Sequence, residues 1–411
     1  MVDAPGSLES LRRLNRLRVL ETVQHRGAAS RVDIVRSTGL SRTTVSSLVA
    51  QLLAEDVLIE RPDRQPQPTV PNVGRPPTLL SLNPTGGGVL GIHFGHDSVR
   101  ILVTDLSCTV LDEAAGELPV GYQARDVFDD VADTALDLVR RCGLTVGRVI
   151  GLGVAVSTPV NAGAQALRVP AVLTGWDDVD LVAEWRARLP LPVFVGNDAN
   201  LGAVAEWTFG AGRGVDDFVY VMLSDGVGAG LVLNGLLYEG ASGTAGEIGH
   251  VVVARDGFVC RCGSRGCLET VAGAGALISA FSHSMGPGTT LDAVLSLARD
   301  GDPGAVRLIE DVGRAVGRAL SGICTVLDPR LVIVGGKTSA AGEPLLAGIR
   351  AALAREVSPS VNRTVRVVGG ELGARAEVLG AIALANRNTA VHLLPGQDSP
   401  SATRRSNGAI R

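Results

Sequence analysis

Three cysteines lie close together in this 411-residue chain, at Cys260, Cys262 and Cys267. No apolar run approaches the length of a membrane span, and the amino terminus lacks the pattern of a signal peptide. We therefore expect a cytoplasmic protein that does not enter a membrane. In a reducing compartment, cysteines crowded in this way favour a bound metal over a disulfide.

The elements that carry this cluster belong to a chain of 411 residues, for which two or three domains are expected. Because 45% of the residues are hydrophobic and 19% are charged, we expect the chain to be globular. The net charge is −4, but residues 1–86 carry +3 and the remainder carries −7. A mildly basic head on an acidic body is typical of a DNA-binding module attached to a sensor. Lys337 is the only lysine, which we interpret as a sign of a GC-rich genome rather than of binding chemistry.

The amino-terminal region carries the signals of a helix-turn-helix. Ser30 precedes Asp33 in a capping-box pattern, Gly39 ends the short helix that follows, and Ser41 can cap the next one. An amphipathic helix before them is indicated by leucines at helical spacing, which are Leu11, Leu14, Leu17 and Leu20. The inward face of the last helix is predicted to be Val45, Leu48, Val49, Leu52 and Leu53.

In a helix-turn-helix, the first turn of this last helix enters the major groove of DNA. Val57–Glu60 begins a strand, and the Pro-rich residues 61–73 would form a wing. Arg75 of the following Gly-Arg-Pro could enter a narrow minor groove, although many such tripeptides are linker turns. A protein-interaction domain is the alternative for the three-helix unit. The predicted DNA contacts are Arg42, Thr43, Thr44, Ser46, Ser47 and Arg75.

Two similar hairpins indicate that the body is a duplicated α/β fold with phosphates held between its halves. The first hairpin joins strands Val89–Phe94 and Val99–Asp105 through Gly95-His96-Asp97. The second joins Phe218–Leu223 and Gly230–Leu233 around Asp225. Further strands are predicted at Val149–Val156 and Val193–Val195, with helical stretches between them.

The body carries three motifs, which are Gly196-Asn197-Asp198-Ala199-Asn200, Ala245-Gly246-Glu247-Ile248-Gly249-His250 and Cys260-Arg261-Cys262-Gly263-Ser264-Arg265-Gly266-Cys267-Leu268-Glu269. These motifs resemble those of the ROK family, named for repressors, open reading frames and sugar kinases. They occur in the family's order and spacing, and the likeness covers residues 5–385. It implies an amino-terminal winged helix-turn-helix followed by a two-lobed, actin-like or RNase H-like ATPase-type sugar-kinase fold.

The resemblance implies a structural zinc site, in which one nitrogen and three sulfur ligands fill a closed tetrahedral shell around Zn²⁺. A reduced thiol cluster and a disulfide are the alternatives. The ligands would be His250, Cys260, Cys262 and Cys267.

The resemblance also implies a sugar site, in which His250 would face both the zinc and the sugar. The family's kinases use the position of Asp198 as the general base, whereas a repressor would only hydrogen-bond the sugar there. Asn197 and Asp198 could also cap the next helix, and the two roles are compatible. The implied sugar-binding residues are Asn197, Asp198, Glu247, His250 and Glu269.

The sequence departs from the family's kinases where those enzymes hold ATP. Their first hairpin carries Asp-x-Gly-Gly-Thr, but here it reads His93-Phe94-Gly95-His96-Asp97. His93 replaces the Mg²⁺-side carboxylate, and Asp97 is expected to repel a γ-phosphate. Asp225 brings another acid into the second turn, whereas Val332–Gly336 keeps the Gly-Gly of the adenosine side. Ser157-Thr158-Pro159 stands where family members often have Pro-Gly-Pro.

These features predict residues 1–73 as the winged helix-turn-helix, 74–86 as wing and linker, 87–388 as the sensor and 389–411 as a disordered tail. The sensor would have lobes at about 87–198 and 199–388. We expect a sugar-responsive repressor of carbohydrate-metabolism genes rather than an enzyme, with operator DNA and a sugar or sugar phosphate as its partners. A homodimer or homotetramer is expected, because paired recognition helices read paired half-sites. An active sugar kinase with Asp198 as its base is the alternative, and regulation by a partner protein without a small ligand is a third possibility.

Overall fold

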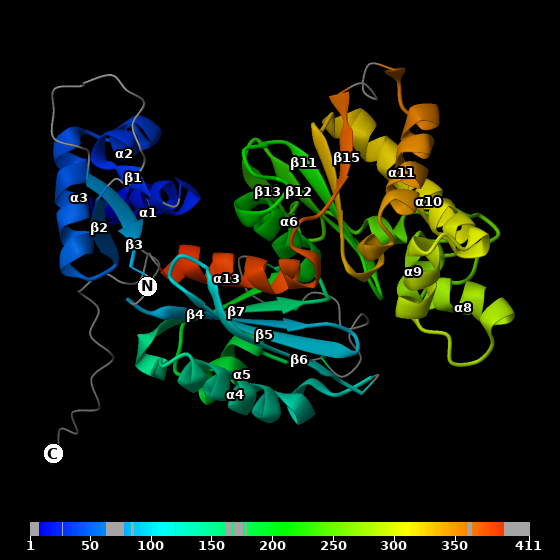
Figure 1. Cartoon of the computed structure of the whole chain (residues 1–411), viewed down its shortest axis with the longest axis horizontal. Coiled ribbons are helices and arrows are strands. Elements are labelled where there is room, and N and C mark those ends of the chain that lie inside the picture. Colours follow the sequence, from blue (N-terminus) through cyan, green and yellow to red (C-terminus); the bar gives the residue numbers. More distant parts are fainter. Residues whose placement is uncertain are drawn as a thin grey trace, which may run out of the picture.

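The computed structural model describes residues 8–26, 28–62, 78–83, 86–119, 121–161, 166–167, 176, 179–359 and 364–389. These form a small head and a two-lobed body, with helix α13 (Ala376–Thr389) lying between the lobes (Figure 1). Residues 63–73 of the predicted wing, Arg75 and residues 390–411 of the predicted tail lie outside the described ranges. No helix in these ranges is long and apolar enough to cross a membrane.

The head is a three-helix unit with a small antiparallel sheet in the order β1-β3-β2. Strand β3 lies in the segment predicted as wing and linker, and its pairing with β1 and β2 makes it part of the head's sheet. The elements are α1 (Leu8–Arg26), β1 (Ala29–Ser30), α2 (Arg31–Thr38), α3 (Arg42–Ala54), β2 (Leu58–Pro62) and β3 (Thr78–Leu82).

Local hydrogen bonds set the limits of α2 and α3. The Asp33 amide donates to Ser30 Oγ at 3.2 Å, and the Ser30 amide donates to Asp33 Oδ2 at 3.1 Å, which is the predicted capping box. Gly39 ends α2 in the left-handed conformation, with φ of 69°. Ser41 Oγ then accepts from the Thr44 amide at 3.1 Å and begins α3. The helix-turn-helix predicted from these residues is confirmed.

The predicted inward face of α3 is confirmed, whereas that of α1 is partly wrong. On α3, Val45, Leu48, Val49 and Leu52 are buried and Leu53 is half-buried. On α1, Leu20 is buried but Leu11 is 56% exposed. Each step of three residues falls about 60° short of a full helical turn. Three such steps separate Leu11 from Leu20, and the accumulated half turn places them on opposite sides of the helix. The side chains of Leu14 and Leu17 are outside the description.

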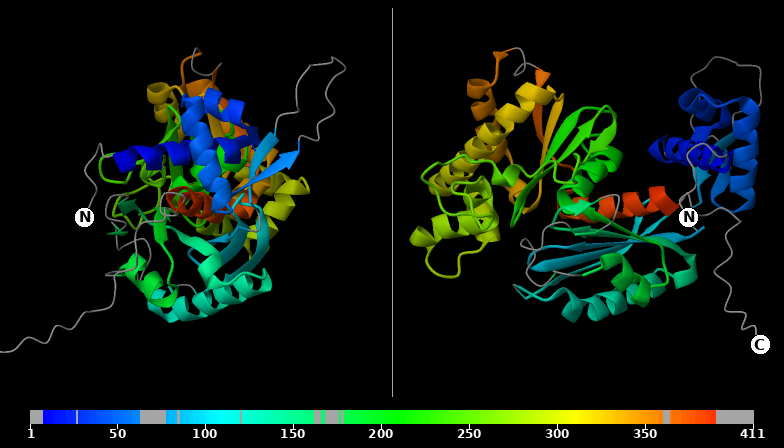
Figure 2. Two further views of the ribbon diagram at one scale, coloured as in Figure 1. Left: turned by 90° about the vertical axis from the view of Figure 1, so that its left-hand side faces the viewer. Right: turned by 180° about the vertical axis from the view of Figure 1, so that it is seen from behind.

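The first lobe is a five-stranded sheet in the order β10-β7-β4-β5-β6. Helices α4 and α5 cover one face of it, and α13 covers the other (Figures 1 and 2). Its elements are β4 (Gly88–Phe94), β5 (Ser98–Asp105), β6 (Val110–Glu117), α4 (Ala124–Arg141), η1 (Val146–Arg148), β7 (Val149–Val156), β8 (Val160–Asn161), β9 (Ala166–Leu167), α5 (Leu181–Arg188) and β10 (Val193–Asn197).

The second lobe repeats the plan of the first, with the order β13-β12-β11-β14-β15. Counted in chain order within a lobe, both sheets read 3-2-1-4-5, with two antiparallel and two parallel pairings in the same places. The predicted duplication is therefore confirmed, although β12 begins three residues before the predicted strand.

Helices α10 and α11 cover one face of the second sheet, and α6 packs on the other. The elements of this lobe are α6 (Asp198–Phe209), β11 (Phe218–Leu223), β12 (Val227–Leu233), β13 (Leu236–Tyr238), η2 (Ile248–His250), α7 (Glu269–Ala272), α8 (Ala274–Met285), α9 (Leu291–Arg299), α10 (Pro303–Leu327), β14 (Leu331–Gly335), η3 (Lys337–Ala341), α11 (Glu343–Glu356), β15 (Arg366–Gly369) and η4 (Gly373–Arg375).

Glycines allow α13 to lie directly on the first sheet and on α6. A Cβ at Gly153 of β7 would lie 1.9 Å from the carbonyl oxygen of Ala381, and one at Gly380 would lie 1.9 Å from that of Leu201. Backbones can approach this closely only where the side chain is a hydrogen atom. The last helix of the second predicted lobe therefore joins the two sheets through close packing on each side.

Replacement of Gly380 by Ala is expected to destabilise the body by about 1–3 kcal/mol, because the added methyl group has no room beside Leu201. Gly322→Ala is the matched control, since its Cβ would point into open space on α10 and should add up to about 1 kcal/mol of stability. Denaturant unfolding of both variants measures the difference. Equal unfolding midpoints would contradict the packing described for α13.

Candidate functional site

A pocket lies between the lobes, where the two hairpin turns face each other. The first lobe contributes His93, Gly95 and Ser157, and the second contributes residues 224–229 and Lys337. The pocket is also lined by all five residues predicted to bind sugar, which are Asn197, Asp198, Glu247, His250 and Glu269. They come from β10, α6, the turn before η2, η2 itself and α7, so the fold brings the separate motifs to one place.

Asp198 is the buried carboxylate of this pocket. It begins α6, and Asn197 caps that helix by accepting from the Asn200 amide at 3.1 Å, so the predicted capping role is confirmed. Asp198 Oδ1 accepts from the Ala199 amide at 2.8 Å, and Oδ2 accepts from Ser157 Oγ at 2.5 Å. Burial raises the pKa of Asp198 to about 6, against the lowering by these hydrogen bonds.

His93 faces the same carboxylate from β4. Its Nε2 lies 4.0 Å from Asp198 Oδ2 and has no hydrogen-bond partner among the described residues, although the atom is buried. Burial first, and then the charges of Arg100 and Lys337, lower the pKa of His93 to about 4. The imidazole is therefore neutral near pH 7, and it does not form an ion pair with Asp198.

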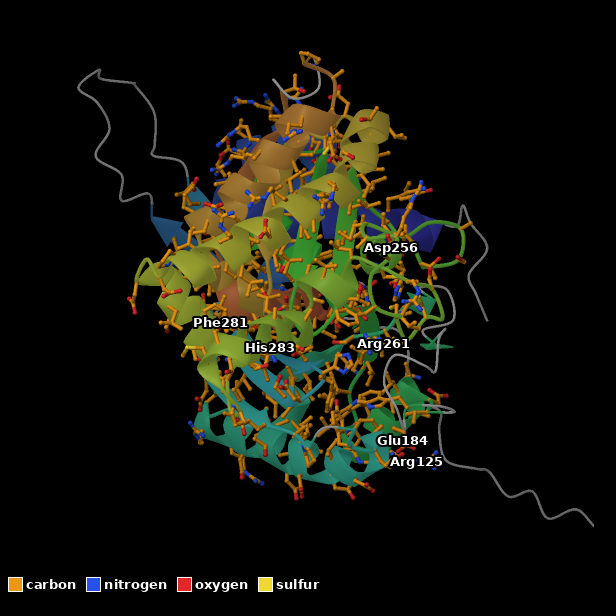
Figure 3. All side chains as sticks on the ribbon, turned by 90° about the vertical axis from the view of Figure 1, so that its right-hand side faces the viewer. Arg125, Glu184, Asp256, Arg261, Phe281 and His283 are labelled. Carbon is orange, nitrogen blue, oxygen red and sulfur yellow. The ribbon has the colours of Figure 1, made fainter. Side chains whose placement is uncertain are left out.

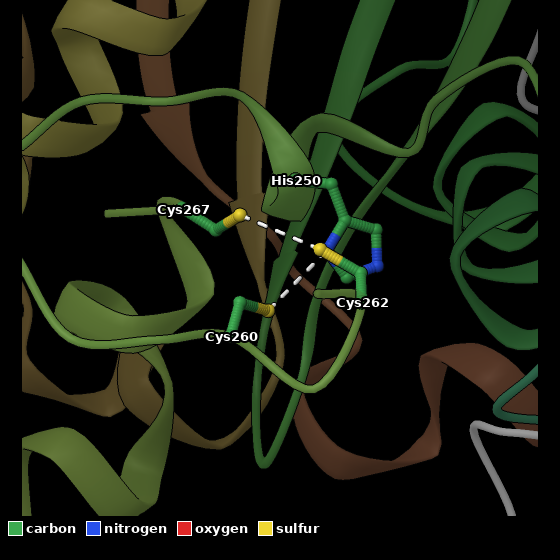
Figure 4. Close-up of side chains that lie close together, drawn as sticks. All are labelled: His250, Cys260, Cys262 and Cys267. Atoms are coloured by element: carbon green, nitrogen blue, oxygen red, sulfur yellow. Dashed lines mark hydrogen bonds between the residues drawn. The ribbon is translucent and has the colours of Figure 1, made fainter. Parts of the chain in front are cut away.

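The four predicted metal ligands form one cluster (Figure 4). Cys262 Sγ lies 3.7 Å from Cys267 Sγ, Cys260 Sγ lies 3.7 Å from His250 Nδ1, and the four atoms are all within 4.8 Å of one another. Zn–S bonds of about 2.3 Å at tetrahedral angles place sulfurs about 3.7 Å apart. Both the donor set and the spacing of the cluster therefore fit a zinc ion.

His250 connects this cluster to the pocket. Its Nδ1 faces Cys260, and its Nε2 lies 3.9 Å from Glu247 Oε2, which lines the pocket. The two ring nitrogens thus face different sites, as the sequence analysis expects of this histidine.

Lys337 joins the two hairpin turns. Its Nζ lies 2.9 Å from Asp97 Oδ1 in the first turn and 2.9 Å from Asp225 Oδ2 in the second. One cation therefore pairs with both of the acids that depart from the kinase pattern, and the three charged groups together keep one net negative charge. Sequence reasoning missed Lys337, although its being the only lysine and its place after Gly335-Gly336 were the available signals.

Arg261 makes a second connection between the lobes. Its Nη1 lies 3.3 Å from His96 Nε2 in the first turn, and its Nε lies 3.1 Å from Glu269 Oε1. Figure 3 shows Arg261 where the loops of the second lobe face the first lobe. Like Lys337, it was not among the predicted site residues, because only the fold places it opposite the first hairpin.

The predicted DNA contacts of the head lie on α3, apart from Arg75. Arg42, Thr43, Ser46 and Ser47 are exposed, while Thr44 is half-buried against Ser41. Both views place α3 on the side of the head away from the lobes (Figures 1 and 2). The first turn of this helix is therefore accessible to a large partner.

The fold and the pocket define a class of protein, a two-lobed sugar-kinase-like body that carries a helix-turn-helix head. The sequence profile of the ROK family matches residues 89–388. Because this match covers most of the chain, the protein belongs to the ROK family.

The relatives of this chain include a repressor and a kinase. A xylose repressor of Caldicellulosiruptor bescii is 27% identical over 392 residues, covering 92% of this chain and 97% of its own. A glucokinase of Thermotoga maritima is 31% identical over 310 residues, covering 72% and 96%. Among solved structures, a ROK family transcriptional regulator homologous to the E. coli MLC protein matches 93% of this chain and 98% of its own, with a TM-score of 0.78 and 24% identity, which shows the common fold.

Asp198→Asn is expected to stabilise the fold above pH 7, because it removes a charge that burial disfavours. The folded pKa of about 6 exceeds the ordinary value of 3.8, so the wild-type fold binds more protons than the unfolded chain between these values and loses stability as the pH rises through them. The variant should gain up to about 3 kcal/mol at pH 7.5 and progressively less toward pH 5. Chemical denaturation against pH measures this gain, with exposed Asp133→Asn as the control. A gain in stability that does not depend on pH would contradict the raised pKa of Asp198.

Proposed function

We propose that this protein is a sugar-responsive transcriptional repressor, in which the head binds operator DNA and the body binds the sugar. The observation that carries the proposal is the set of charged residues in and beside the pocket. Its sugar-side carboxylates, Asp198 and Glu247, are in place, while the two hairpin turns carry Asp97 and Asp225, which both pair with Lys337. The relative named xylose repressor supports it, because the alignment extends over the head as well as the body.

The sugar would be held by fixed acceptors and donors around its hydroxyl groups. Asp198 is oriented by Ser157 and by the start of α6, so a hydroxyl that donates to it has a defined position. Asn197, Glu247, His250 and Glu269 line the same pocket and would contact the remaining hydroxyls. None of these roles requires transfer of a phosphate.

Zinc would brace one wall of the sugar site. His250, Cys260, Cys262 and Cys267 would hold the ion through His250 Nδ1 and the three sulfurs. The ion would supply a cross-link that ties residues 250–267 together, with every coordination position filled by protein. The imidazole of His250 would then be fixed in the orientation that directs Nε2 toward the pocket.

The head would bind DNA through the first turn of α3. Arg42, Thr43, Thr44, Ser46 and Ser47 would contact the major groove, and Arg75 would contact the minor groove. Two heads on a homodimer or homotetramer would read paired half-sites. Sugar binding changes DNA affinity only if it favours one arrangement of lobes and head over another, and a two-lobed body that closes on its ligand provides such a difference.

An active sugar kinase is the second candidate. The buried carboxylate of Asp198, with its pKa raised to about 6, suits a general base near neutral pH. The two acids at the phosphate loops oppose this reading, because ATP would have to displace their ion pairs with Lys337.

The full chain distinguishes these functions when it is assayed with xylose, glucose and N-acetylglucosamine, with and without Mg-ATP. The DNA would be a duplex that the protein itself selects from a random pool. We expect one sugar to change retention of this DNA without release of ADP. ADP formation at ordinary kinase turnover, on the order of 1–100 per second, would contradict the regulatory function.

Variants of the head test whether α3 contacts the DNA. Arg42→Ala should weaken DNA binding by roughly 10–100-fold, because an arginine contact in the major groove contributes about 1–3 kcal/mol. Arg355→Ala on α11 is the control, since this exposed arginine of the body has the same charge. Equal loss in both variants would indicate nonspecific charge attraction instead of groove recognition.

Cys262→Ser is expected to lower zinc content, thermal stability and the sugar response together, because a serine hydroxyl is a poor zinc ligand. Cys142→Ser, at a half-buried thiol outside the cluster, should leave all three unchanged. Zinc is measured by metal analysis of the purified chain. An unaltered zinc content in Cys262→Ser would refute the assigned ligands.

A further inference from the structure

The cationic side chains of the pocket are already committed to acids. Lys337 bridges Asp97 and Asp225, and Arg261 pairs with Glu269. A phosphate binds tightly to a cationic side chain that is not already paired, such as the lysine of a nucleotide-binding loop. Here an incoming phosphate would have to compete with carboxylates of this chain for each of these cations.

Three backbone amides at the same turns also donate to acceptors within the chain. The Gly95 amide donates to Ser98 O at 2.8 Å, the Ser224 amide to Gly226 O at 3.0 Å, and the Lys337 amide to Ser224 Oγ at 3.1 Å. Glycine loops bind phosphate by directing unused N–H groups at it. These three groups cannot serve a phosphate unless the turns rearrange.

The electrostatic balance of the pocket also disfavours an anion. Among the described residues that line it, four are acidic and two are cationic. Both cations pair with acids, and Asp198 and Glu247 remain as carboxylates on the sugar side. A ligand that carries a phosphate dianion would meet net negative charge across the pocket, whereas a neutral ligand would not.

The gap between His93 and Asp198 has the geometry to recognise a hydroxyl group. Its two edges, His93 Nε2 and Asp198 Oδ2, are 4.0 Å apart, and Nε2 is buried without a partner among the described residues. An oxygen about 2.8 Å from each would satisfy both by accepting from the imidazole N–H and donating to the carboxylate. A phosphate ester oxygen has no proton to donate there, so it would be repelled by Asp198.

We propose that the body binds an uncharged sugar and rejects sugar phosphates and nucleotides, with His93 and Asp198 recognising one hydroxyl and Lys337, Asp97 and Asp225 closing the phosphate side. This inference rests on the proposed function and names the ligand class of the same site. His93 and Lys337 then become specificity-determining residues. Lys337 fills the loops that would hold nucleotide with ion pairs, and His93 offers a hydroxyl contact where a kinase would place the Mg²⁺-side carboxylate.

Calorimetry on the full, zinc-loaded chain tests the ligand class. Xylose, glucose and N-acetylglucosamine are compared with glucose 6-phosphate, N-acetylglucosamine 6-phosphate and a nonhydrolysable Mg-ATP analogue. We expect a neutral sugar to bind at least 100-fold more tightly than either phosphate, and the analogue not to bind. Tighter binding of a sugar phosphate than of its parent sugar overturns the inference while leaving the repressor function standing. If none of the compounds binds, the proposed function fails and the inference fails with it.

A charge-release variant tests the closed phosphate side. Asp97→Thr with Asp225→Ser leaves Lys337 without its two acids, so affinity for glucose 6-phosphate should rise at least tenfold and binding of the ATP analogue should become measurable. Adding Lys337→Met to this double variant should abolish the gain, because the released cation is then absent. No gain in the double variant, with the unfolding midpoint unchanged, would refute the role of these three residues.

A pair of variants at His93 tests the hydroxyl contact. His93→Leu removes the donor and should weaken binding of the neutral sugar at least tenfold, whereas His93→Asn keeps an N–H group and should restore part of the affinity. The unfolding midpoint of the body reports whether each variant is folded. Wild-type sugar affinity in His93→Leu, or equal losses in both variants, would contradict the contact.

Discussion

Helix α13 packs its backbone directly on β7 and on α6, and this contact sets how the two lobes meet. Gly153 and Gly380 leave no room for a Cβ, so the helix has one position relative to each neighbour. α6 begins at Asp198, and this packing therefore sets where the pocket carboxylate stands relative to the first sheet. Ser157 and His93, at the ends of β7 and β4, meet Asp198 because those strands end beside the start of α6.

Ion pairs also connect the two hairpin turns across the cleft between the lobes. The three residues Asp97, Lys337 and Asp225 form ion pairs, but Lys337 is 40% exposed, and ion pairs that accessible contribute about 0–1 kcal/mol each. These ion pairs matter more because they fill the space between the two turns than because they stabilise the fold. One lysine and two carboxylates lie between the hairpin turns of the two lobes, and Lys337 contacts both turns.

Local patterns predicted much of this protein correctly. The capping box at Ser30, the turn at Gly39 and the burial of Val45, Leu48, Val49 and Leu52 follow from residues a few positions apart. The two hairpins were also predictable, because alternating apolar strands and glycine turns are short-range signals. Leu11 shows the limit of such reasoning, since a spacing of three drifts around the helix and leaves that leucine exposed.

The His and Cys residues of the cluster and the motif residues that line the pocket could be identified from the sequence, because their types and spacing are recognisable within short segments. The distant residues that complete the site became apparent only from the folded structure. Asp97, Asp225 and Lys337 come from separate turns, Ser157 donates to a carboxylate 41 positions away, and His93 faces the same carboxylate from another strand. Such contacts depend on how two sheets and a helix are packed, and no periodicity along the chain encodes that arrangement.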